Sequence, residues 1–202
     1  MFGLPKSTEL SKQLPKKAIY AKFNMNTAAK EKFDADISKI AIVAEISPST
    51  TTIAKGETVS SIYVLLVSLK RKDFDEKTIV GLSKLIDQNI LFVLDFDGKQ
   101  KLAVYHGKLM QGEWLPSNDL VIPLKGLNFD AVWQNIIVQA GEVQIEQGKT
   151  LDEQLAVNEK RAKFQKEIDR LEKLARAERQ PKKKLELVKK QNNLRKQIDS
   201  LS

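Results

Sequence analysis

Five side chains in the middle of the chain are of the types that a metal-dependent nuclease uses. Carboxylates hold Mg²⁺ and a lysine orients the attacking water, so such a site would recruit Glu57, Asp95, Asp97, Lys99 and Lys101. Their sequence positions favour a simpler interpretation, because Asp97 belongs to a turn, the lysines flank a hairpin and Glu57 lies in a loop. No spaced acidic–acidic–x–Lys triplet stands out. We therefore expect no catalytic residue, and keep the nuclease as the alternative.

The cysteine and histidine content and the missing motifs limit which other kinds of catalytic or metal site the chain can form. The chain has no cysteine, which excludes a disulfide framework, a thiolate metal site and a cysteine nucleophile. A single histidine, His106, excludes multi-histidine metal clusters and is interpreted as a half-buried polar residue rather than a base. GxSxG, Walker A and GxGxxG motifs are absent, so we predict no metal and no cofactor. Trp114 and Trp133 are interpreted as core or pocket-edge residues, with an interface anchor as the alternative.

The composition suits one medium domain with a basic appendage. Of the 202 residues 42% are hydrophobic and 30% are charged, which is enough to bury a core. The N-terminus lacks a signal-peptide apolar region, and no apolar run approaches the ~18 residues of a membrane span, so we expect a cytoplasmic protein. Residues 150–202 hold 15 basic and 9 acidic residues and carry +6 of the net +8. A basic tail favours polyanions or acidic protein surfaces, and a solvated helix face is the alternative.

Three segments in the middle of the chain predict a sheet. Ile62–Leu69 is almost continuously apolar and predicts a central strand buried on both faces. A helix is expected to start at Asp73 or Asp75. "ILFVL" and "KLAVYH" then predict two strands joined at Asp97-Gly98, since both residues accept a positive φ. The strand–helix–strand connection at 62–95 is compatible with a parallel right-handed crossover.

The flanking segments give weaker signals. Residues 1–25 are expected to be extended, with a short helix near Ser7–Gln13. The pattern of Asn26–Ile46 predicts a helix that Thr27 can cap, although the segment "IAIVAEI" is also compatible with a strand. Residues 47–58 predict a loop or a short strand, and Trp114 with residues 119–124 suggest one or two further strands.

Residues 128–139 form the clearest amphipathic helix. Asn128 suits its N-cap, and Gly141 stands where a left-handed residue would end the helix. Together these elements predict an α+β (or α/β) domain over residues 1–148. Its mixed sheet is expected to have about four to five strands with covering helices.

The tail, residues 150–202, changes from a globular pattern to coiled-coil spacing. Apolar positions recur in steps of three and four on both sides of Pro181, with Gln191 as one polar position. A proline costs roughly 3 kcal/mol inside a helix but nothing at a first helical position, so two helices turning near Pro181 are expected. The fold-back places Leu171 near Gln191, which would fix the register. A long kinked helix that pairs with another chain fits the same spacing.

The tail carries both candidate binding surfaces. The residues that would neutralise DNA phosphates without reading bases are Lys182, Lys183, Lys184, Lys189, Lys190, Arg195 and Lys196. The apolar residues that would dock on a partner protein are Phe164, Ile168, Leu171, Leu187, Leu194 and Ile198. No aromatic residue interleaves the cations, so stacking on single-stranded bases is not expected. The sequence does not indicate an oligomeric state.

Seven segments, in this order, carry a resemblance to a known family. They are "FGLPKST", "LPKKAIYAKF", "SPSTTTIAKG", "IYVLLVSLKRKDFDE", "QNILFVLDFDGKQKLAVYHGK", "GLNFDAVWQNIIVQ" and "ERQPKKKLELVKKQNNLRKQI". Together they resemble domain-of-unknown-function family 4391 over almost the whole chain. The resemblance implies a companion of helicases and DNA methyltransferases in restriction-modification or phage-defence clusters, and it supplies no catalytic residues. We therefore expect a non-catalytic accessory subunit that docks on such an enzyme and contacts DNA non-specifically.

Overall fold

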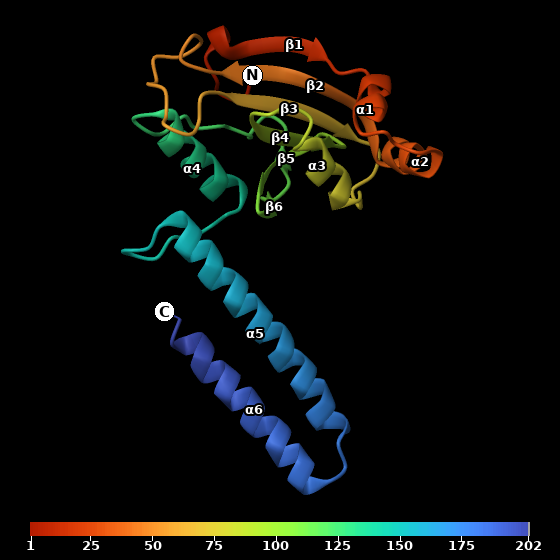
Figure 1. The fold of residues 1–202 in the computed structure, drawn as a ribbon, viewed down its shortest axis with the longest axis vertical. Coiled ribbons are helices and arrows are strands. Elements are labelled where there is room, and N and C mark those ends of the chain that lie inside the picture. The colour runs from red at the N-terminus through yellow and green to blue at the C-terminus, as the bar shows by residue number, and fades with distance from the viewer. Residues whose placement is uncertain (202) are drawn as a thin grey trace. The chain divides into compact units, whose positions relative to one another are not determined.

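The structure is a computed structural model that describes residues 1–201. The chain forms two compact units, Met1–Val143 and Gln144–Ser202. The first unit contains a sheet with short helices, and the second contains two long helices (Figure 1). Each unit is described separately below.

A mixed sheet forms the centre of the first unit, which confirms the predicted α+β class. Six strands follow one another in spatial order: β1 (Glu9–Gln13), β2 (Ile37–Ile46), β3 (Ile62–Leu69), β4 (Asn89–Phe96), β5 (Lys99–His106) and β6 (Lys108–Gln111). The short β7 (Leu115–Pro116) pairs with β5. Only β3 and β4 are parallel, and every other pair in the described sheet is antiparallel. The sheet exceeds the expected four to five strands because its edge strands are short and lack an apolar pattern.

Helices cover both faces of the sheet. The helices are α1 (Lys16–Lys22), α2 (Thr27–Asp36), α3 (Glu76–Leu82) and α4 (Phe129–Ala140), with a 3-10 turn at Lys6–Thr8. One apolar cluster joins residues of α1, α2 and α3 to Leu65, Phe92 and Leu94 of the central strands. Leu91 and Val93 alternate with Phe92 and Leu94 and are equally buried, on the face where α4 packs against β5. This two-sided burial explains why β3 and β4 read as unbroken apolar runs.

Four sequence predictions are corrected. The second half of the expected helix at 26–46 is strand β2, because "IAIVAEI" is rich in β-branched residues and pairs with β3. Asn26, not Thr27, caps α2 by accepting from the Ala29 amide. The expected helix near Ser7–Gln13 is instead the 3-10 turn followed by β1. Residues 119–124 form no strand, and only β7 follows Trp114 in the described sheet.

Gly141 ends α4 for a different reason from the one predicted. Its φ is −96°, and the left-handed residue is the next one, Glu142, at φ 49°. A Cβ on Gly141 would lie 2.2 Å from the Met110 Cε atom. The missing side chain makes room for the flexible end of Met110, which would have to move aside for a larger residue, and no positive φ is involved.

Asp36, the last residue of α2, is buried completely and organises the segment between β3 and α3. Its side chain accepts from Arg71 Nε at 2.5 Å and from the Asp75 amide at 2.9 Å. Its carbonyl oxygen accepts from the Lys70 amide at 2.8 Å. Asp75 in turn caps α3, as predicted, by accepting from the Lys77 amide. One buried carboxylate thus fixes where α3 begins.

Asp130, in the first turn of α4, anchors the loop before β3. Its carboxylate accepts from the Thr58 hydroxyl at 2.6 Å and from the amides of Glu57, Thr58 and Val59. The bond from the Thr58 side chain and those from the backbone lower the pKa of Asp130 to about 2. Gly56 must be glycine for this contact, because a Cβ there would lie 2.5 Å from Asp130 Oδ1.

Acid is expected to weaken this anchor within a defined pH range. The Asp130 pKa is about 2 in the folded chain and 3.8 ordinarily, so its contribution is complete above pH 3.8 and is lost as the pH falls toward 2. Asp130→Asn should accelerate amide exchange at Glu57, Thr58 and Val59 and flatten the pH dependence of stability between about pH 4 and 2. Hydrogen exchange by NMR measures the first effect and urea unfolding the second. The exposed Asp73→Asn serves as the control, and equal effects of both changes would refute the anchor.

Candidate nucleic-acid interface

The second unit is a helical hairpin. Helix α5 (Leu151–Ala177) and helix α6 (Pro181–Asp199) pack against each other and are joined by residues 178–180 (Figure 1). Thr150 and Glu153 form a capping box at the start of α5. Pro181 is the first residue of α6, where its missing amide costs no hydrogen bond. The predicted fold-back near Pro181 is thus confirmed, rather than the long kinked helix.

The seam between the helices contains a buried polar residue at Gln191, as predicted. Ile168, Leu171 and Ala175 of α5 are buried, and so is Gln191 of α6. The Gln191 side-chain amide donates to the Ile168 carbonyl at 3.3 Å. This contact ties one position of α6 to one turn of α5, which is how a polar seam residue selects a register.

Replacing Gln191 with an apolar residue should make the hairpin more stable but its register less specific. Gln191→Leu is expected to stabilise the hairpin by about 1 kcal/mol and so to raise its thermal midpoint. The long hydrogen bond that is lost goes to a carbonyl already bonded within α5, and apolar burial replaces it. We also expect dimers, since the apolar seam then tolerates pairing with a second chain. Circular dichroism and light scattering measure the two effects. Asn192→Leu, at an exposed position, is the control, and a lowered midpoint only for Gln191→Leu would contradict the expectation.

Glu146 holds the open end of the hairpin together. Its carboxylate accepts from Lys149 and, at 2.7 Å, from Arg161 Nη1. These two partners lower the pKa of Glu146 to about 2. Lys149 also donates to the Leu201 carbonyl at 3.0 Å, so the segment before α5 is bonded to the residues after α6.

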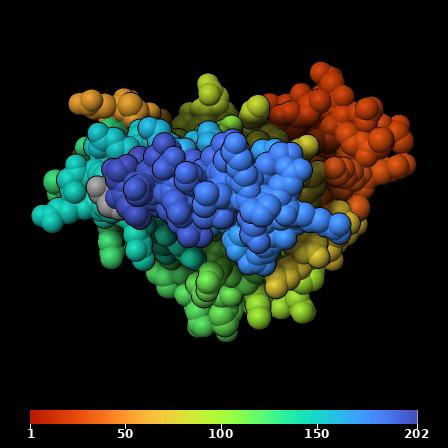
Figure 2. All heavy atoms as spheres, turned by 90° about the horizontal axis from the view of Figure 1, so that it is seen from below, coloured from red at the N-terminus to blue at the C-terminus, as the bar shows by residue number. Residues whose placement is uncertain are grey.

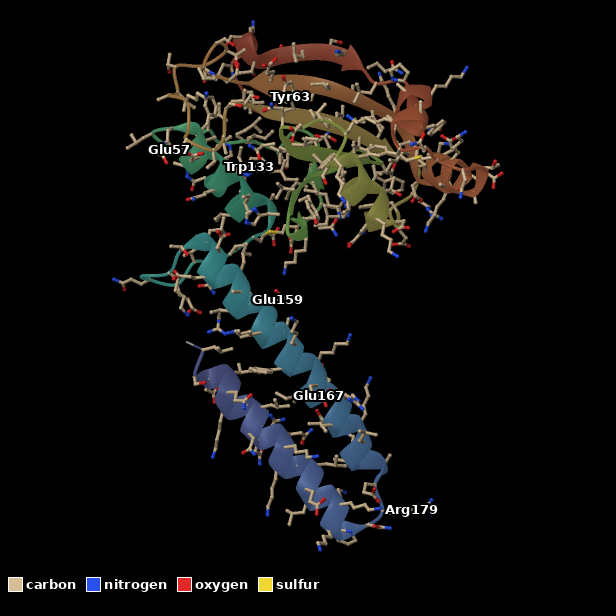
Figure 3. The ribbon with its side chains drawn as sticks, in the orientation of Figure 1. Glu57, Tyr63, Trp133, Glu159, Glu167 and Arg179 are labelled. Carbon is tan, nitrogen blue, oxygen red and sulfur yellow. The ribbon has the colours of Figure 1, made fainter. Side chains whose placement is uncertain are left out.

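Of the seven cations of α5, three pair with glutamates of the same helix and a fourth, Arg161, pairs with Glu146. The three within the helix each pair with a glutamate one turn earlier: Lys163 with Glu159 at 2.7 Å, Arg170 with Glu167 at 3.3 Å and Arg176 with Glu172 at 2.5 Å. Figure 3 shows Glu159 and Glu167 along α5. Over its whole length α5 has seven basic and six acidic residues, so its net charge is +1.

The cations of α6 are not neutralised in this way. The helix has seven basic and two acidic residues, for a net charge of +5. All seven predicted phosphate-contacting residues lie on it and are exposed, and within residues 1–201 none of them pairs with a carboxylate. In the space-filling view the outer side of α6 (blue) faces the viewer, with no other part of the hairpin over it (Figure 2).

Three of these lysines form a row along one side of α6. Lys182, Lys189 and Lys196 are seven residues apart and therefore return to nearly the same side of the helix, about 10.5 Å apart along its axis. Lys189 lies two residues from both Leu187 and Gln191, about 200° around the helix, so the row points away from the seam. We call Lys182, Lys189 and Lys196 the lysine row.

The predicted docking residues line the seam instead of an open surface. Ile168 and Leu171 are almost fully buried. Half-buried side chains make up the rest of the set: Phe164, Leu187, Leu194 and Ile198. A partner can therefore reach the four half-buried residues at the margins of the seam, but the two buried ones only if the hairpin opens.

The residues considered for metal-dependent cleavage are used elsewhere in the first unit. Asp97 has φ 50° in the β4–β5 turn, as predicted, and Asp95 accepts from the Gln100 side chain at 3.0 Å. Glu57 lies by the first turn of α4, where its amide donates to Asp130 (Figure 3). Lys99 is exposed. In the part of the chain that the structure describes, no three His, Asp or Glu side chains are placed to hold a metal ion.

Lys101 has an environment that the sequence did not indicate. It is only 8% exposed, and its Nζ atom lies 4.7 Å from the ring centre of Trp114 and 5.4 Å from that of Phe74. Burial lowers its pKa, with the charge of Lys72 acting in the same direction and that of Glu76 opposing it. The ring faces compensate part of the lost hydration of the ammonium group.

The remaining aromatic residues belong to the fold. Trp133 is 9% exposed in the apolar stripe of α4 (Figure 3), and Trp114 packs edge-on against Phe96 with ring centres 6.4 Å apart. Both match the interpretation as core or pocket-edge residues. His106 ends β5 and is half-buried, also as expected. No helix within the described residues is long and apolar enough to cross a membrane.

Comparison with known proteins identifies one family. The model of the family described as "Domain of unknown function (DUF4391)" matches residues 2–198, which is nearly the whole chain. Neither the curated proteins nor the solved structures gave a match.

Proposed function

The chain belongs to the DUF4391 family, and we propose that it is a non-catalytic, cytoplasmic accessory subunit of a DNA restriction-modification or phage-defence system. In this proposal it docks on a helicase or DNA methyltransferase and contacts DNA through α6. The resemblance to companions of such enzymes supplies the context. The charge distribution of the hairpin supports the proposed contact with DNA.

The observation that carries the DNA contact is the difference between the two helices. Cations paired with glutamates, as on α5, gain less from a phosphate because the neighbouring carboxylate repels it. Unpaired exposed cations, as on α6, release counterions when they meet phosphates, which is the main source of non-specific affinity for nucleic acid. The lysine row spans about 21 Å along the helix, a length over which duplex DNA carries roughly a dozen charges.

Docking on an enzyme partner would use the margins of the seam. Phe164, Leu187, Leu194 and Ile198 keep part of their apolar surface exposed on the hairpin. Burial of such surface favours association, and the surrounding charges would orient the partner.

The test is binding of labelled duplex DNA to the full chain, measured by fluorescence anisotropy across salt concentration. If the lysine row alone meets phosphates, the slope of log K against log salt should be about −3, and about −6 if all seven cations do. Affinity should be the same for unrelated sequences, because these contacts do not read bases. Absence of binding even at about 50 mM salt would refute the DNA contact. Titration of the full chain with a purified restriction-system helicase or DNA methyltransferase from the same genome would then test docking alone.

A further inference from the structure

A pocket in the first unit, far along the chain from the hairpin, lies between the α1–α2 turn, α2 and α3. Its volume is about 480 Å³, within the range of small-molecule sites. Its apolar lining includes Phe23, Met25, Phe33 and Leu82. Phe33 and Leu82 are core residues, whereas Phe23 and Met25 are half-buried, so the pocket opens from the core to solvent.

Gly81 in the wall of this pocket has no structural reason to be glycine. It is the second-last residue of α3, and glycine is a poor helix former. Its φ is not positive, and a Cβ there would meet no atom within 4 Å. Neither conformation nor close packing therefore requires glycine. The effect of the missing side chain is that this wall of the pocket stays bare.

The rim of the pocket carries a positive charge. The Asp75 carboxylate pairs with Lys32 at 2.5 Å and accepts from the Lys77 amide at 2.9 Å. Lys32 and then the Lys77 amide lower the pKa of Asp75, so it remains ionised and neutralises Lys32. The Lys77 ammonium group forms no salt bridge within residues 1–201, although its charge also acts on the Asp75 carboxylate. An anion at the rim would pair with Lys77.

From the apolar lining, the bare wall at Gly81 and the unpaired Lys77, we propose that this pocket binds a small organic anion. The ligand would have an apolar body of one or two rings and one carboxylate or sulfonate group. Its body contacts Phe23, Met25 and Leu82, and its charge lies at Lys77. This inference is independent of the proposed DNA contact, which concerns the other unit.

The test uses 1-anilinonaphthalene-8-sulfonate, which has two aromatic groups and one sulfonate, titrated into the full chain while its fluorescence is followed. We expect saturable binding to one site. Gly81→Leu should weaken it by about tenfold or more by filling the pocket, and Ala29→Phe should do the same from the opposite wall. Gly81→Ala is the matched control, since its methyl group leaves most of the pocket open, and should bind within about twofold of the wild type.

The charge requirement is tested by Lys77→Gln. This change should weaken binding of the sulfonate several-fold and leave binding of the neutral N-phenyl-1-naphthylamine unchanged. Circular dichroism melts of all variants report whether they fold. Non-saturable fluorescence, or equal binding by the wild type and a folded filling variant, would overturn the proposal. Equal loss of both dyes in Lys77→Gln would overturn the requirement for an anion.

Discussion

Changing Lys182, Lys189 and Lys196 together to glutamine is expected to weaken binding of the full chain to duplex DNA on the order of 100-fold at about 0.1 M salt. These side chains are exposed and unpaired within residues 1–201, so each can release a counterion on meeting a phosphate. The slope of log K against log salt should become about 3 less steep, roughly one for each lost lysine. Fluorescence anisotropy across salt concentration measures both quantities.

Helix α5 offers a control with the same change of net charge. Lys163, Arg170 and Arg176 are also exposed, but each is paired with a glutamate on its own helix. Changing these three to glutamine should lower the affinity only a few-fold, through the net charge of the protein. If the two triple variants lose affinity equally, binding depends on total charge and the lysine row has no special role.

Changing Asp36 to alanine is expected to destabilise the first unit by about 2–3 kcal/mol. Asp36 is fully buried and accepts from Arg71 Nε and from the Asp75 amide. Its removal leaves the Asp75 amide without an acceptor and opens a space at the end of α2. Urea unfolding followed by tryptophan fluorescence measures the loss, and both tryptophans, Trp114 and Trp133, lie in the first unit.

Asp34, two residues earlier on α2, provides the comparison for Asp36. It accepts from Lys16 and from the Tyr20 hydroxyl, both at 2.6 Å, but its side chain is 46% exposed. A partly exposed ion pair and one hydrogen bond together contribute about 1 kcal/mol, so Asp34→Ala should cost clearly less than Asp36→Ala. Comparable losses for the two variants would show that burial of Asp36 adds nothing.

The sequence predicted those elements whose burial or capping is local. The unbroken apolar runs of β3 and β4, the Asp97-Gly98 turn and the stripe of α4 are each visible within a dozen residues. The hairpin followed from coiled-coil spacing on both sides of Pro181, which the structure places at the first position of α6.

Other elements depend on contacts between distant parts of the chain. All five residues of β1 are exposed, and the strand forms because its backbone pairs with β2. The packing role of Gly141 depends on Met110, some thirty residues away, whose position the local sequence does not indicate. The intrinsic propensities of residues 37–46 are compatible with either a helix or a strand, and they form a strand because they pair with β3.

Only part of the candidate sites could likewise be predicted from the sequence. The seven cations of α6 are visible as a basic run, and glutamates four residues before Lys163 and Arg176 indicate that α5 pairs its own charges. The ring environment of Lys101 and the pocket beside Gly81 bring together residues from separate elements. No spacing within a single segment signals them.

The edges of the sheet bear on whether the protein remains dispersed at high concentration. β1 has five exposed residues that include Glu9 and Lys12, and its register with β2 shifts between those two. The opposite edge is formed by the four residues of β6 and the two of β7. Edges that are short, charged and irregular make poor templates for a strand of another molecule. Seven strands are thereby kept from extending into an intermolecular sheet, although the central strands are among the most apolar segments of the chain.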